Sequence, residues 1–156
     1  MPEARTGEPP ETAATRALAA AASAIRLQGR VPALTGAVVV RLLDDANAAV
    51  GAVPWGLADA LARRVAGVTA LDVDPSSQPD PPTDDDRPLV VVARDTHRSP
   101  TARSWLERAM ARRPDLVLVD LGWPSAETPT PAAVALVHAH GASPTSARAV
   151  VDRLLA

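Results

Sequence analysis

The feature that most limits the possible fold is a run of five apolar residues at 89–93 that stops abruptly at polar side chains. Three of the five are valine, and a continuous apolar run of this length is typical of a strand buried on both faces of a parallel sheet. Arg94, Asp95, His97 and Arg98 follow at once. Ligands of open α/β sheets bind beyond the carboxyl ends of the strands, so this tip is the first place to look for function.

Other apolar runs along the chain alternate with segments of helical composition. The pattern predicts strands at 37–43, 68–73, 89–93, 116–121 and 133–139, and helices at 11–28, 57–65, 100–113 and 144–156. Ser99 and Ser143 stand as N-caps, each followed by a proline suited to the first helical turn. Because no hairpin signal joins successive strands, we expect a three-layer α/β sandwich, with helices on both faces of a mostly parallel sheet of about five strands.

The length of 156 residues suits one domain. Residues 1–10 hold three prolines and a glycine and are expected to be a disordered lead, so the α/β domain would span 11–156. The stretch 75–88 is rich in proline and aspartate and is predicted to be an exposed loop.

Composition excludes several kinds of chemistry. All sixteen basic residues are arginine, so no P-loop lysine or Schiff base is possible, and the absence of cysteine removes disulfides and thiolate sites. The net charge is −2 and the arginines are dispersed, which disfavours nucleic-acid binding. No run reaches the roughly twenty apolar residues of a membrane span, so we expect a soluble, cytoplasmic protein.

The predicted strand ends carry polar residues that admit two interpretations each. His97 is either a general acid held by Asp95 or Arg94, or a solvated turn residue. Arg94 and Arg98 either clamp a carboxylate or phosphate, or pair with Asp95 and Asp120. Asp44, Asp45, Asn47, Asp72 and Asp74 complete this polar rim.

His138 and His140 alternate with an alanine and would share one face of a strand, but no third metal ligand is evident, so we expect neither a metal nor a cofactor. Trp55, Trp105 and Trp123 are the only aromatic residues of the Phe, Tyr and Trp class. They would be sugar-stacking platforms if exposed and core or interface residues if buried.

Four segments together resemble a known family. They are NAAVGAVPWGLADALA at 47–62, RPLVVVARDTHRSP at 87–100, RPDLVLVDLGWP at 113–124 and HAHGASPTSARAVVDRLL at 138–155. In this order they resemble the C-terminal α/β domain of bacterial glycoside hydrolase family 3, in the β-N-acetylglucosaminidase (β-N-acetylhexosaminidase) branch. The resemblance implies an enzyme that removes terminal β-linked N-acetylglucosamine from chitin or cell-wall fragments.

In that family an N-terminal barrel supplies the aspartate nucleophile and the His and Asp acid/base pair, and its Lys-His motif binds substrate. A chain of 156 residues is too short to include that barrel as well as the α/β domain, and without lysine it cannot contain the Lys-His motif. No catalytic residue of the family therefore transfers to a numbered position here. By resemblance, Arg94, Asp95, His97 and Arg98 lie toward the catalytic domain. With Asp120 and Trp123 they are the candidate substrate or interface residues.

Three functions remain open. The first is a detached or truncated accessory domain of such a hydrolase, which has no catalytic activity alone and acts together with a catalytic barrel. The second is a free-standing module that binds a sugar, such as one containing N-acetylglucosamine, or an anion. The third is a small hydrolase that uses Asp95 and His97.

Overall fold

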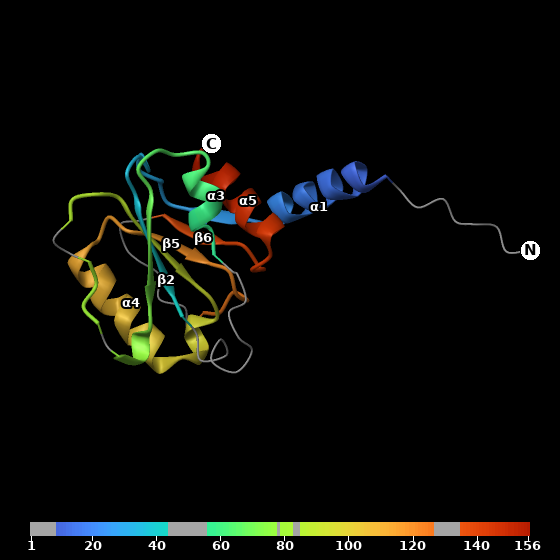
Figure 1. Ribbon diagram of the computed structural model, residues 1–156. Coiled ribbons are helices and arrows are strands. Elements are labelled where there is room, and N and C mark those ends of the chain that lie inside the picture. Colours follow the sequence, from blue (N-terminus) through green and yellow to red (C-terminus); the bar gives the residue numbers. More distant parts are fainter. Residues whose placement is uncertain (1–8, 44–55, 78, 83–84, 127–134) are drawn as a thin grey trace, which may run out of the picture.

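A six-stranded sheet forms the centre of the computed structural model, which describes residues 9–43, 56–77, 79–82, 85–126 and 135–156 (Figure 1). The strands lie in the order β1-β6-β5-β4-β2-β3, and all neighbours are parallel except the β1 and β6 pair. Their bounds are β1 Arg26–Gln28, β2 Val38–Leu42, β3 Thr69–Val73, β4 Leu89–Ala93, β5 Val117–Asp120 and β6 Leu136–His138. The predicted α/β class and mostly parallel sheet are therefore confirmed, with one strand more than expected.

Helices cover both faces of the sheet, as predicted (Figure 1). They are α1 Pro10–Ala24, α3 Ala58–Ala62, α4 Pro100–Arg112 and α5 Pro144–Leu154, with short 3-10 turns η1 Pro75–Ser77 and η2 Thr96–Arg98. Helix α4 packs on one face, where Trp105 and Leu106 join the alternate strand residues Val40 and Val91 in one apolar cluster. Helices α3, α5 and the end of α1 cover the other face.

The extra strand is β1, which the sequence predicted as the end of the first helix. Helix α1 stops at Ala24 because Ile25 adopts an extended conformation (φ −70°, ψ 134°) and is buried in the core. Residues 26–28 then pair antiparallel with β6, and Gly29 leaves the strand with φ 81°. The predicted helix 11–28 was therefore wrong in its last turn, because edge pairing and burial of Ile25 outweigh helix propensity.

Helix α1 contacts the rest of the domain chiefly through α5. None of its residues is buried, and only Leu18 and Ala21 pack against the core cluster. Its first half projects beyond the sheet in Figure 1. Among the described residues, no helix combines the length and apolar character that crossing a bilayer requires.

The described residues of the segment 75–88 pack partly against the rest of the domain. Pro75 and Pro81 are buried, and the Pro79 carbonyl accepts a hydrogen bond from the indole Nε1–H of Trp105 (2.9 Å). The buried Arg113 side chain donates to the Asp85 carbonyl (2.6 Å). The predicted exposed loop is thus buried at two of its described prolines, because proline rings supply apolar surface and the buried Trp105 indole N–H of helix α4 requires an acceptor.

Candidate functional site

Three strand ends place the candidate residues at one edge of the sheet. Ala93 of β4 lies opposite Asp120 of β5, and Asp120 lies opposite His138 of β6. The chain runs from β2 outward to β3 and returns to β4 on the other side of β2, so the direction of winding reverses between β2 and β4. This reversal is where open α/β sheets form ligand crevices, and Arg94 and Asp95 follow β4 there. Residues 44, 45 and 47, predicted to belong to the same rim, lie outside the described residues.

Asp120 is a fully buried carboxylate at the centre of this edge. Its Oδ1 accepts the Gly122 N–H (2.8 Å), while its Oδ2 lies 3.8 Å from Nδ1 of His138, too far for a hydrogen bond. Within the described part of the chain, neither Asp120 Oδ2 nor His138 Nδ1 has a hydrogen-bond partner. Burial raises the pKa of Asp120, and the Gly122 amide and His138 oppose that rise.

Asp95 fixes the turn that follows β5. It adopts the left-handed conformation (φ 49°), which aspartate tolerates better than most residues. Its Oδ1 accepts the backbone N–H of Trp123 (3.1 Å), and its Oδ2 lies 3.6 Å from Nε of Arg94. A Cβ at Gly122 would lie 2.3 Å from Asp95 Oδ1 and 2.5 Å from its backbone nitrogen. The ends of β4 and β5 are thus interlocked, an arrangement that the sequence did not indicate.

His97 is not held as a general acid would be. Its Nδ1 is buried and makes no hydrogen bond within the described residues, and neither does the hydroxyl of its buried neighbour Thr96. The His97 carbonyl accepts a hydrogen bond from Arg103 (2.7 Å). The structure therefore brings His97 to the rim without the hydrogen bond to Asp95 or Arg94 that the catalytic interpretation requires.

The arginine pairing that we expected is found in part. Arg94 makes its ion pair with Asp95, but the side chain that faces Asp120 is His138, with its Nδ1 at 3.8 Å, rather than an arginine. Arg98 is exposed and has no ion pair in the described ranges. Of the two arginines, Arg98 is thus the one whose guanidinium remains open to an external anion.

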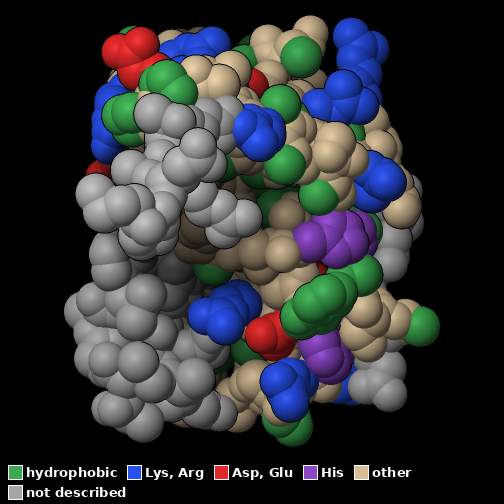
Figure 2. Space-filling view, turned by 90° about the vertical axis from the view of Figure 1, so that its right-hand side faces the viewer, with side chains coloured by type: hydrophobic (Ala, Val, Ile, Leu, Met, Phe, Trp, Pro, Cys, Tyr) green, Lys and Arg blue, Asp and Glu red, His purple; other side chains and the backbone are tan. Residues whose placement is uncertain are grey.

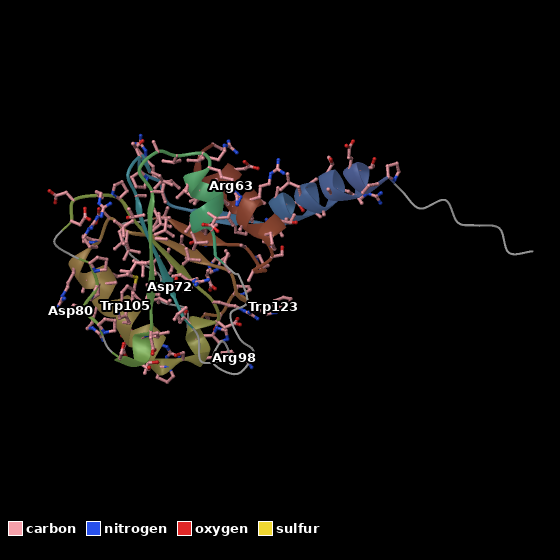
Figure 3. All side chains as sticks on the ribbon, in the orientation of Figure 1. Arg63, Asp72, Asp80, Arg98, Trp105 and Trp123 are labelled. Carbon is pink, nitrogen blue, oxygen red and sulfur yellow. The ribbon has the colours of Figure 1, made fainter. Side chains whose placement is uncertain are left out.

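The two described tryptophans have opposite environments. Trp105 is completely buried within helix α4, as a core residue should be. Trp123 is 75% exposed, although its backbone is fixed by Asp95. Figure 3 shows Trp123 and Arg98 at the same end of the molecule, with Trp123 projecting outward. Trp123 is therefore the aromatic residue available for stacking, whereas Trp55 lies outside the described residues.

The histidine pair differs from the prediction of one shared strand face. Strand β6 ends at His138, and His140 follows in a left-handed conformation (φ 54°), with ring centroids 6.5 Å apart. No group of three or more His, Cys, Asp or Glu side chains that could hold a metal ion occurs among the described residues. Histidine, acidic, arginine and hydrophobic side chains do gather on the face seen in Figure 2.

Comparison with known proteins places this fold in a class. No protein-family model matches the chain, and no curated protein matches it in sequence. Among solved structures, a glycoside hydrolase family 3 β-N-acetylglucosaminidase from Paenibacillus sp. str. FPU-7 aligns with a TM-score of 0.63 at 16% identity, over 99% of this chain and 32% of that one.

Two further structures align in the same way. Zinc-bound CbsA from Thermotoga neapolitana has a TM-score of 0.63 and 17% identity, over 88% of this chain and 29% of its own. The β-glucoside phosphorylase BglX, bound to 2FGlc, has a TM-score of 0.62 and 14% identity, over 97% of this chain and 32% of its own. The chain thus has the fold of a part of these three structures, one of them a glycoside hydrolase family 3 enzyme, and it spans about a third of their length.

Proposed function

We propose that this chain is the accessory α/β domain of a β-N-acetylhexosaminidase of the family 3 type, and that it is not catalytic alone. The observation that carries the proposal is the alignment of almost the whole chain with about a third of much longer proteins, one of them a β-N-acetylglucosaminidase. The reaction that it would assist is removal of terminal N-acetylglucosamine from chitin or cell-wall fragments.

The geometry of the rim supports a role in contact rather than in catalysis. Asp95, the best placed carboxylate, accepts a hydrogen bond from the Trp123 backbone N–H and lies 3.6 Å from Arg94, so it already has partners that hold the turn. Asp120 is buried, away from any substrate. Trp123 and Arg98 are both exposed at the same end of the molecule (Figure 3), and an exposed aromatic ring and a cation suit a sugar or a partner surface.

The test is release of p-nitrophenol from p-nitrophenyl β-N-acetylglucosaminide. We expect no turnover by the purified chain, and increased turnover when it is added to a family 3 catalytic barrel expressed without its own α/β domain. Trp123→Ala should weaken this activation roughly tenfold, and Trp123→Phe, the matched control, should retain most of it. Turnover by the chain alone that is abolished by His97→Ala would refute the proposal and favour the small-hydrolase alternative.

A second candidate, a free-standing sugar-binding module, is favoured by one specific observation. The backbone of Trp123 is fixed by Asp95 while its ring is 75% exposed, which is the arrangement of a preformed stacking platform. Titration with N-acetylglucosamine, followed by tryptophan fluorescence, distinguishes this candidate from the first. Saturable quenching that disappears in Trp123→Phe, without any effect of the chain on a barrel, would favour the module.

A further inference from the structure

A groove of about 550 Å³ lies between helices α3 and α5, apart from the rim. The two helices are neighbours on one face of the sheet (Figure 1). Helix α3 and its end contribute Asp59, Arg63 and Arg64 to the lining, and α5 contributes Arg148. This volume falls in the range of sites that hold small organic molecules.

The charges of the groove are unbalanced. Arg64 is paired with Asp152, at 2.6 Å. Arg63 and Arg148 are exposed, and neither has an ion pair or a hydrogen bond within the ranges that the structure describes. Asp59 is the one acidic side chain in the described lining. Two unpaired guanidinium groups on one groove are notable because the whole chain has a net charge of −2.

The remaining lining is apolar. Ala60 belongs to α3, and Pro144, Ala147 and Val151 belong to α5, where Ala147 and Val151 are buried. An apolar wall lowers the local dielectric constant and strengthens the attraction between a bound anion and the arginines. A groove of this composition suits a ligand that has an apolar body as well as a negative charge.

We propose that this groove binds a small organic anion whose phosphate or carboxylate group pairs with Arg63 and Arg148 while its apolar body lies on Ala147 and Val151. Guanidinium groups recognise both kinds of oxyanion in bidentate geometry, so the two chemistries are alternatives for one site. The site shares no residue with the candidate residues of the rim. Its existence is therefore independent of the proposed accessory function.

The test is a titration of the ¹⁵N-labelled full chain followed by amide chemical shifts. The probes are phenyl phosphate and isophthalate, which carry the two oxyanions on an aromatic body, and benzyl alcohol is the neutral control. We expect saturable shifts confined to α3 and α5 for at least one anion, and none for benzyl alcohol. Raising the salt from about 0.05 M to about 0.5 M should weaken binding severalfold, because the arginines are exposed.

Variants assign the binding to the named groups. Arg63→Gln and Arg148→Gln should each weaken binding roughly fivefold to tenfold, and the double variant should abolish it. Asp59→Asn should tighten binding about twofold, since it removes the opposing charge. Arg153→Gln is the matched control, because Arg153 is an exposed arginine on the same helix that does not line the groove.

Two results would overturn the proposal. One is absence of saturable shifts with either anion, while circular dichroism shows a folded chain. The other is binding that Arg153→Gln weakens as much as Arg63→Gln and Arg148→Gln do, which would indicate general attraction to surface arginines.

Discussion

Replacing Gly122 by alanine tests the interlocking of the β4 and β5 ends. The added Cβ would lie 2.3 Å from Oδ1, 2.5 Å from the backbone nitrogen and 2.9 Å from Cγ of Asp95. The carboxylate can rotate away, but the backbone nitrogen cannot, so the two turns must separate. Rotation of the carboxylate also removes the hydrogen bond that it accepts from Trp123.

The expected cost follows from these two effects. Overpacking against backbone costs about 1–3 kcal/mol, and losing one hydrogen bond costs about 1 kcal/mol. We therefore expect Gly122→Ala to lower the free energy of unfolding by about 3 kcal/mol. In a domain of this size that corresponds to a fall in Tm of roughly 6–12 °C.

Urea and thermal unfolding followed by circular dichroism measure this change. Gly141→Ala is the matched control, since Gly141 follows β6 at the same end of the sheet and its added Cβ would meet the Ser146 hydroxyl at 3.1 Å. That hydroxyl can rotate, so the control should lose less than about 1 kcal/mol. If the free energy of unfolding of Gly122→Ala differs from that of the original chain by less than about 0.5 kcal/mol, the interlocked turns do not stabilise the domain.

Three other predictions concern stability and its pH dependence. Trp105→Phe should cost about 1–3 kcal/mol in urea unfolding, because it removes the hydrogen bond to the Pro79 carbonyl and leaves a void. Burial raises the pKa of Asp120, so the stability contributed by its protonated form is present below pH 3.8 and is lost as the pH rises through the raised pKa. The original chain should therefore lose stability relative to Asp120→Asn as the pH rises above 3.8. Hydrogen bonds from Arg87 lower the pKa of Asp85 to about 2, so its contribution is present above pH 3.8, and the original chain should lose more stability than Asp85→Asn as pH falls from about 4 to 2.

Each of these has a contrary outcome in the same unfolding series. A Trp105→Phe chain as stable as the original would mean that the indole N–H contributes nothing. If the difference in free energy of unfolding between the original chain and Asp120→Asn does not depend on pH, burial does not shift the pKa of the Asp120 carboxyl. Parallel acid profiles for the original chain and Asp85→Asn would show that the Arg87 contact is absent in solution.

Local signals in the sequence predicted most of the fold. Valine-rich runs predicted β2, β4 and β5. The N-cap serines of α4 and α5 were predicted equally well from the residues next to them. The Ser99 hydroxyl accepts the Ala102 N–H (3.3 Å), and the Ser143 hydroxyl accepts the Ser146 N–H (3.0 Å), each next to a proline in the first turn. These features depend on neighbours within four residues, so a single sequence contains the information.

The features that were missed depend on distant partners. Strand β1 exists because residues 26–28 meet β6, and propensity alone continues the helix through them. The burial of Asp120 and the exposure of Trp123 are likewise set by the packing of three strand ends. The sequence predicted that polar residues gather at this edge, but not which of them would be enclosed and which would face solvent.

The pairing of the first strand with the last has a consequence for synthesis on the ribosome. Helix α1 packs on α5, and β1 pairs with β6, so the opening segment finds its main contacts near the end of the chain. During translation, the alanine-rich α1 is synthesised before its partner α5, and β1 is synthesised before its partner β6. We therefore expect the middle strands to assemble first, and the N-terminal segment to dock only after α5 has left the exit tunnel.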